Sequence, residues 1–224
     1  MIPAAQWRPA RVVSVETASA DMISLLIAPD TETVHRAGQH YEIRFPGDEL
    51  GRKYSIVSPP DDPAPLEFGV QILAKGLVSP RLARSLPGTP IELRGPLGEA
   101  FTWSPDAGPS LILIGGGAGI TPLLSIYAAF THAYPRGTCR FLLSAKRPDL
   151  VYHLDRYEGI LITRYTGTAP RLTAADLADL LGELLHDPTA AARICGPGGM
   201  IDSVVDNLVD LGFPEDRIRS EAFV

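Results

Sequence analysis

The sequence predicts an antiparallel β domain followed by an α/β domain with a parallel sheet. Up to about residue 105, short runs of β-forming residues alternate with clusters of Asp, Gly and Pro. Beyond that point, longer apolar strands alternate with helical patterns, which is typical of a parallel sheet covered on both faces. A chain of 224 residues suits either one large domain or two of roughly 100 residues each, so two such units fit its length.

The first half has six expected strands and one expected helix. Their regular spacing favours an antiparallel barrel or a sandwich. The helix is expected over residues 78–86, between the fifth and sixth strands. The strands are expected at 11–16, 22–29, 40–45, 53–58, 66–73 and 90–95.

The second half follows a linker at residues 103–110 and begins with a continuous apolar strand that ends in glycines. Long apolar strands of this kind are buried on both faces in parallel sheets. The expected strands are 111–117, 139–145, 159–165, 191–197 and 217–223, and the expected helices are 119–134, 173–185 and 199–212.

Composition argues against several classes of protein. Hydrophobic residues make up 45% of the chain and charged residues 21%, with 21 Gly and 21 Pro, which is an ordinary globular composition rich in turns. The net charge of -6, without a basic stripe, argues against nucleic-acid binding. The sequence has no apolar run long enough to cross a bilayer and no secretory signal pattern, so we expect a cytoplasmic protein without a membrane partner.

The metal-binding residue types are too sparse for a metal site. Cys139 and Cys195 are too few for a disulfide framework, a zinc site or an iron–sulfur cluster. The five histidines, at positions 35, 40, 132, 153 and 186, show no metal-ligand spacing, and we interpret them as surface or packed residues. We therefore expect no metal in this chain.

Two glycine-rich segments each follow an expected strand of the second half. The stretch IGGGAGITP, at 114–122, opens a helix, where backbone amides and the helix dipole favour an anion. It matches G-x-G-x-x-G only loosely, and a tight turn without a ligand is the alternative. The stretch ICGPGGM, at 194–200, is the second such end, and the carboxyl edge of a parallel sheet is where these folds bind ligands.

The order of six motifs resembles the ferredoxin–NADP reductase superfamily of flavin-dependent oxidoreductases. The motifs are R-x-Y-S, G-x-x-S, G-P-x-G, G-G-G-x-G-I-T-P, C-G-P and a terminal E-x-F, and they extend from about residue 10 to the C-terminus. The resemblance implies a six-stranded flavin-binding β-barrel, which we expect over residues 1–105, and an NAD(P)-binding α/β domain over 106–224.

The resemblance also assigns residues to a flavin, expected to be FAD with FMN as an alternative. Arg52 would bind the pyrophosphate, Tyr54 would lie against the isoalloxazine, and Ser55 would sit by flavin N5. Alternation along a strand puts Arg52 and Tyr54 on one face, but Ser55 on the other unless the strand twists or ends there. Gly76, Val78 and Ser79 would bind diphosphate at a helix start, although Ser79 also suits an N-cap without a ligand.

Three residues are implied at the contact between nicotinamide and flavin, namely Ser55, Cys195 and Glu221. Cys195 would position the rings and would not act as a nucleophile, and its alternative is a small buried hydrophobe. Phe223 would shield the other flavin face, although Val224 follows it where many members end. The nicotinamide side is assigned to Gly115, Gly116, Gly117, Gly119, Thr121, Pro122, Gly196 and Pro197.

Basic residues after the second and third strands of the parallel sheet favour NADPH over NADH. Lys146 and Arg147 follow one strand, and Arg164 and Arg171 lie in and after the next. Basic side chains there suit a 2'-phosphate, whereas an acidic residue suits a ribose hydroxyl. Solvated loop arginines are the alternative.

The resulting hypothesis is an NAD(P)H-dependent flavin oxidoreductase with a separate electron acceptor, because no ferredoxin domain is recognised in this sequence. A ferredoxin, a flavodoxin, an oxygenase component or a free flavin would serve. The alternative is a non-catalytic flavin- or nucleotide-binding subunit for electron transfer or sensing within a larger complex.

Overall fold

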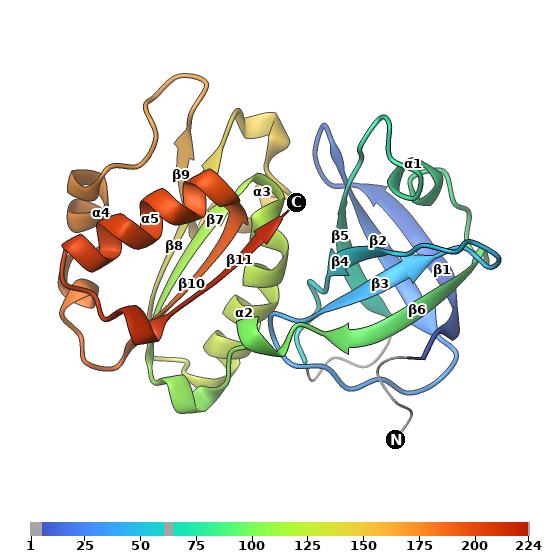
Figure 1. Ribbon diagram of the computed structural model, residues 1–224, viewed down its shortest axis with the longest axis horizontal. Helices are drawn as coiled ribbons and strands as arrows, with labels where there is room; N and C mark the ends of the chain where they lie inside the picture. The colour runs from blue at the N-terminus through green and yellow to red at the C-terminus, as the bar shows by residue number, and fades with distance from the viewer. Residues whose placement is uncertain (1–5, 61–64, 224) are drawn as a thin grey trace.

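The computed structural model describes residues 6–60 and 65–223. These residues form one antiparallel sheet and one parallel sheet, together with the helices and loops that connect the strands. The antiparallel sheet comes first in the chain, and Figure 1 shows the two sheets in neighbouring units. Val224, whose position after Phe223 was noted above, lies outside the described residues.

The antiparallel sheet closes into a barrel. Its six strands are ordered β4-β3-β6-β1-β2-β5. Ile56, just after β4, bridges Phe68 on β5, so the two outer strands meet. The backbone N–H of Val57 also donates to the carbonyl of Glu67 at 2.8 Å. The strands are β1 (Arg8–Thr17), β2 (Met22–Pro29), β3 (His40–Arg44), β4 (Arg52–Ser55), β5 (Leu66–Gln71) and β6 (Pro90–Leu97).

The second sheet has five parallel strands in the order β11-β10-β7-β8-β9. Its strands are β7 (Ser110–Gly116), β8 (Thr138–Ala145), β9 (Leu161–Tyr165), β10 (Ala190–Pro197) and β11 (Ile218–Phe223). The helices of this half are α2 (Ile120–Ala133), α3 (Leu154–Tyr157), α4 (Ala174–Leu181) and α5 (Gly198–Asp210).

Helices cover both faces of the parallel sheet, which explains the continuous apolar strands. Leu111 and Leu113 of β7 face the core that contains α2, whereas Ile112 and Ile114 face the core that contains α4 and α5. The α2 core also includes Val57 and other residues of the barrel, so apolar packing is continuous between the two units. None of the described helices is both long and apolar enough to cross a bilayer.

Polar contacts also join the barrel to the α/β half. The hydroxyl of Ser125 donates to the carbonyl of Ser58 at 2.8 Å, and that of Tyr152 donates to the Glu67 carboxylate at 2.7 Å. Tyr152 is fully buried. These contacts join α2 to the segment after β4, and the segment before α3 to β5, and they therefore help to set the position of the barrel relative to the parallel sheet.

Three expected elements differ from the structure. The helix expected over 78–86 is only α1 (Ser79–Leu82), because the chain turns towards Pro87 and Gly88. The strand expected over 53–58 ends at Ser55. The helix expected over 173–185 divides at Gly182, whose φ of 51° interrupts the α-helix, and continues as a 3-10 turn.

Candidate functional site

A pocket of about 640 Å³ opens between the barrel and the C-terminal strand. We call it the barrel pocket. Strands β3 and β4 and the loop after β5 form its barrel side, and β11 reaches it from the parallel sheet (Figure 1). Its lining residues are His40, Glu42, 51–55, Gln71, Leu73, 76–79 and 221–223.

The three residues of the R-x-Y-S motif all line the barrel pocket. Arg52 is exposed, and its only hydrogen bond among the described residues goes to the carbonyl of Gly51 at 2.9 Å. Burial raises the pKa of Tyr54 to about 12, against the opposing charge of Arg52, so its hydroxyl stays protonated. Ser55 is the last residue of β4, and this strand end lets it reach the pocket despite the alternation.

The loop after β5 presents backbone amides at the pocket wall. Leu77, Val78 and Ser79 line the pocket, and their N–H groups donate to no partner in the part of the chain that the structure describes. Consecutive free amides form an anion-binding concavity. Arg52 and these amides therefore offer two kinds of donor to a phosphate.

The side chain of Ser79 has a structural partner that the sequence did not indicate. Its hydroxyl accepts the N–H of Leu73 at 3.0 Å, and Ser79 is itself buried. The N-cap of α1 is Val78, which provides no side-chain cap, so an N-cap role for Ser79 is wrong. Because α1 has only four residues, its dipole adds little to the site, and the loop amides matter more.

His40 is a pocket residue that the sequence interpretation passed over. It is 6% exposed, and neither ring nitrogen has a hydrogen-bond partner among the described residues. Its Nδ1 lies 3.8 Å from Oε1 of Glu221, too far for a hydrogen bond. Burial and then the charge of Lys53 lower the pKa of His40, against the effect of Glu42, so the ring is neutral.

Glu221 reaches the pocket from β11, and its environment favours the protonated acid. Burial raises the pKa of its carboxyl, while the charge of Lys53 acts in the opposite direction. A neutral imidazole therefore faces a carboxyl group that can hold a proton. Buried polar atoms without partners are rare in folded proteins, so the two nitrogens of His40 point to a polar ligand in this pocket.

Cys195 lies beside Glu221 but does not line the barrel pocket. The two residues are register partners on the parallel strands β10 and β11. Burial, and then the charge of Glu221, raise the pKa of the Cys195 thiol far above its usual range. A buried, protonated thiol is a poor nucleophile, so this position supports contact or packing and not covalent chemistry.

A second hollow, of about 410 Å³, lies at the carboxyl edge of the parallel sheet. We call it the glycine cleft. Gly116 and Gly117 enter it from the end of β7, and Pro197, Gly199 and Met200 enter it from the end of β10 and the start of α5. The neighbouring strands β7 and β10 thus bring the two glycine-rich segments together, as expected from the sequence.

Four glycines of these segments do not line the cleft, and three of them, Gly115, Gly119 and Gly196, pack against neighbouring strands or turns, whereas Gly198 has no close neighbour. A Cβ on Gly119 would overlap the carbonyl oxygen of Cys195, and one on Gly196 would lie 3.1 Å from Cα of Gly116. Gly115 faces the apolar side chains of Leu143 and Leu123. These three glycines let the strand ends approach closely, which is a structural role.

Thr121 and Pro122 are also absent from the cleft. Both are buried in the first turn of α2, where the Thr121 hydroxyl donates to the carbonyl of Ala118 at 3.0 Å. The Thr121 methyl group packs directly against Gly69 of β5, so closely that a Cβ on Gly69 would overlap it. Thr121 therefore contributes to the contact between the barrel and α2.

The four basic residues divide into two pairs. Lys146 and Arg171 line the glycine cleft. Arg147 instead pairs with Asp149 at 3.0 Å, and Arg164 donates to the carbonyl of Pro170 at 3.0 Å with Asp176 at 3.5 Å. Neither Arg147 nor Arg164 lines the cleft. Asp149 holds the side chain of Arg147 and Asp176 that of Arg164 outside it.

Several residues of both hollows were missed by sequence reasoning. In the barrel pocket the register places His40 opposite Ser55, a signal that appears only once β3 and β4 are paired. In the glycine cleft, Ser144 is the second-last residue of β8 and Thr166 directly follows β9, and their position at strand ends could have indicated them. Other unassigned lining residues are Glu42, Lys53, Gln71, Leu73, Leu77, Leu172, Met200 and Ser203.

The barrel pocket has the donors that a flavin nucleotide requires. Its volume lies within the usual range for cofactor sites. A free guanidinium and adjacent amides suit a diphosphate, the half-buried Tyr54 ring offers an apolar face, and the nitrogens of His40 need a polar partner. The residues present therefore fit this group.

Comparison with known proteins identifies the first half and the overall fold. Residues 9–102 match the family model of the oxidoreductase FAD-binding domain. The chain is 27% identical to the reductase component of propane 2-monooxygenase from Rhodococcus jostii, across 95% of this chain and 62% of that protein. It is 29% identical to NADH-cytochrome b5 reductase 1 of Lodderomyces elongisporus, across 84% of this chain and 69% of that protein.

A solved structure matches almost the whole of both chains. The ferredoxin NADP+ reductase from Neisseria gonorrhoeae, determined with bound FAD and NADP, superposes with a TM-score of 0.79 at 21% identity. The match covers 97% of this chain and 99% of that one. Residues 9–102 therefore match the oxidoreductase FAD-binding domain family, and the chain as a whole shares its fold with this ferredoxin NADP+ reductase.

Proposed function

We propose that the chain is an NAD(P)H-dependent flavin oxidoreductase that passes electrons to a separate acceptor. One observation carries this proposal. Strand β11 lines the barrel pocket through residues 221–223, while its neighbour β10 leads into the glycine cleft. The flavin side and the nucleotide side are thus built on adjacent strands.

Named residues would hold FAD in the barrel pocket. Arg52 and the amides of 77–79 would bind the phosphates, because a guanidinium and free N–H groups favour phosphate oxygens. Tyr54 would lie against the ring system and Phe223 would cover it from the C-terminal side, since both line the pocket. When bound, the flavin supplies hydride acceptance and electron release, chemistry that protein side chains lack.

The residues around the reacting edge of the flavin would position the nicotinamide and the flavin, and would hold a proton. Ser55 offers a hydroxyl from the end of β4, and Glu221 a carboxyl that holds a proton more readily than an exposed one. Cys195, protonated and paired in register with Glu221, would limit how closely the nicotinamide approaches. Alignment of this kind accounts for much of the rate of bimolecular reactions held in one site.

We propose NADPH as the preferred nicotinamide. Lys146 and Arg171 line the glycine cleft, and no Asp or Glu is among its described lining residues. Basic side chains favour a 2'-phosphate, and an acidic residue would have favoured a free ribose hydroxyl. Arg147, held by Asp149, is outside the cleft and provides a natural control.

The domain division at 105 and 106 and the acceptor belong to the same proposal. The antiparallel strands end at Leu97 and the parallel strands begin at Ser110, which supports residues 1–105 as the flavin unit and 106–224 as the nucleotide unit. The chain spans 62% of the propane 2-monooxygenase reductase component, so the acceptor is proposed by analogy as an oxygenase component, a ferredoxin or a flavodoxin.

Anaerobic mixing with NADPH and with NADH tests the proposal. We expect the visible absorbance of the flavin to bleach within seconds, and faster with NADPH than with NADH. Arg171→Gln should slow the reaction with NADPH by about tenfold and reduce the difference in rate between NADPH and NADH. Arg147→Gln should change neither the rate with NADPH nor this difference. A flavin that neither nucleotide reduces would instead support a non-catalytic flavin-binding subunit.

A further inference from the structure

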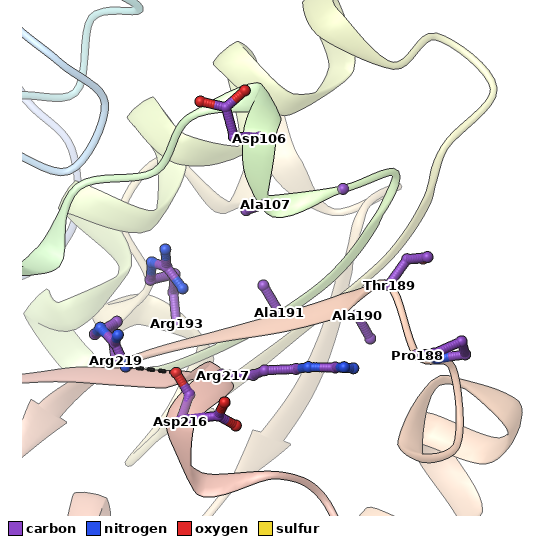
Figure 2. A pocket seen from close by; sticks show the side chains of 11 residues that line it. Asp106, Ala107, Pro188, Thr189, Ala190, Ala191, Arg193, Asp216, Arg217 and Arg219 are labelled. Carbon is purple, nitrogen blue, oxygen red and sulfur yellow. Dashed lines mark hydrogen bonds between the residues drawn. The ribbon is translucent and has the colours of Figure 1, made fainter.

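A third hollow, of about 470 Å³, lies at the opposite edge of the parallel sheet from the glycine cleft. We call it the arginine hollow, after Arg193, Arg217 and Arg219 in its lining. Figure 2 shows Arg193 and Arg219 together at one end, Arg217 along the lower edge, and the small side chains of Ala190 and Ala191 between them. The small residues leave the space open in front of the guanidinium groups.

Arg193 and Arg219 are direct neighbours on parallel strands. They are register partners on β10 and β11, so their side chains leave the sheet on the same face. Arg193 is only 7% exposed. Like charges placed directly opposite each other destabilise a sheet, and the cost increases when one of them is removed from water.

No carboxylate forms an ion pair with these arginines among the described residues, although the charge of Arg217 acts on the nearby Asp187 carboxylate. Arg193 donates to two neutral carbonyls, that of Thr102 at 3.0 Å and that of Ala192 at 3.0 Å. In residues 6–60 and 65–223, none of the three arginines has a carboxylate oxygen within 4.0 Å of its nitrogens. Burial, and then the charge of Arg219, lower the pKa of Arg193 to about 10, which agrees with an uncompensated cation.

The two outer arginines retain free donors. Among the residues that the structure describes, Arg219 donates only through Nη1, to the carbonyls of Asp216 and Ile218, and Arg217 donates only through Nη1, to the carbonyl of Asp187 at 3.5 Å. A guanidinium has five N–H donors in a planar fork that matches phosphate and carboxylate oxygens. The remaining donors of Arg217 and Arg219 are therefore available to an anion in the hollow.

The lining restricts the size and type of that anion. Asp106 and Asp216 are also lining residues, and Figure 2 shows Asp106 across the hollow from the arginines. These carboxylates repel a broad acidic protein surface, and a small anion binds only where the three arginine charges outweigh them. The lining has no aromatic side chain on which a nucleotide base could stack.

We propose that the arginine hollow binds a compact polyanion with at least two phosphate or carboxylate groups, at a site separate from the barrel pocket and the glycine cleft. The available donors of Arg217 and Arg219, with the buried charge of Arg193 beside them, exceed what a single small anion would engage. The site does not depend on the proposed redox function, because its lining shares no residue with the other two hollows.

Calorimetric titration with pyrophosphate tests the proposal. The protein is loaded with FAD and saturated with NADP+ so that the other two sites are occupied; a protein that takes up neither is titrated as purified. Replacing Arg217→Gln and Arg219→Gln together should weaken pyrophosphate binding at least about tenfold. The matched control, Arg11→Gln with Arg84→Gln, removes two exposed charges from the barrel and should leave the affinity unchanged.

Titrations with two other anions identify the class of ligand. Orthophosphate should bind at least about tenfold more weakly than pyrophosphate, and citrate measures whether carboxylates suffice. Equal affinities for orthophosphate and pyrophosphate, an unchanged affinity in the double variant, or an equal loss in the control would each overturn the assignment. Arg219→Gln alone, at an exposed position, repeats the test with less risk to folding.

Discussion

Replacing Gly119 by alanine tests whether the close approach of the β7–α2 turn to β10 positions the residues of the proposed active site. A Cβ at this position would overlap the carbonyl oxygen of Cys195 and lie 2.5 Å from its carbonyl carbon. Ordinary contacts begin at 3.4 Å, and the obstacle is backbone, which cannot rotate away as a side chain can. The turn and the end of β10 must therefore move apart.

Gly117 provides the matched control, two residues away in the same turn. It has a φ of 55°, and a Cβ there would meet no atom within 4 Å. Gly117→Ala should cost about 1 kcal/mol, from the left-handed backbone alone. Gly119→Ala should cost about 3 kcal/mol, the upper part of the range for overpacking a rigid site.

Chemical denaturation gives the free energy of unfolding, and stopped-flow mixing with NADPH gives the rate of flavin reduction. Because a displacement of about 1 Å at a reacting site can cost a factor of about 100, we expect reduction to slow about 10- to 100-fold in Gly119→Ala. Gly117→Ala serves as the control for stability alone, because Gly117 lines the glycine cleft. Equal denaturation midpoints for the two variants would refute the reasoning, as would a parental reduction rate in Gly119→Ala.

Three further predictions concern the barrel pocket and its neighbours. Arg52→Ala should raise the flavin dissociation constant about 10- to 100-fold, as measured by the fluorescence of released flavin. The control Arg84→Ala, which lies outside the pocket, should leave this constant unchanged. Equal effects of the two substitutions would contradict a contact between Arg52 and a phosphate. Cys195→Ala should slow reduction by NADPH about tenfold without loss of bound flavin, and a parental rate would remove its positioning role. The pKa of His40 lies below 6.5, so the unfolded chain takes up a proton that the folded chain resists, and stability should fall with decreasing pH below that value. Denaturation midpoints of His40→Gln should fall less steeply there, and parallel pH profiles would contradict this account.

Much of the fold was predictable because its determinants are local. The strand expected at 22–29 is β2 with the same bounds, and the apolar run ending at the glycines is β7. Alternating or continuous apolar patterns depend on nearest neighbours in the chain, so a sequence reveals them directly. The shortened α1 was missed because it depends on how the following turn leaves the barrel.

The candidate site was predictable in part. The motif residues Arg52, Tyr54 and Ser55 do line one pocket with Glu221 and Phe223. Their roles towards a cofactor stay predictions, as do those assigned to the glycines. Of the basic residues, the sequence could not distinguish Arg171 in the cleft from Arg147, because the difference lies in which carboxylate each side chain meets.

The sequence alone was enough to predict the order of the two sheets and the strand ends that carry glycine, and its motifs predicted a flavin site and a nucleotide site. Only the tertiary structure placed His40 opposite Ser55 and beside Glu221, and set Arg193 against Arg219 at the far edge of the same strands. The physical reason is that strand order and register bring together residues far apart in the chain. No local pattern in the sequence shows which side chains will then interact electrostatically, exchange a proton or contact the same ligand.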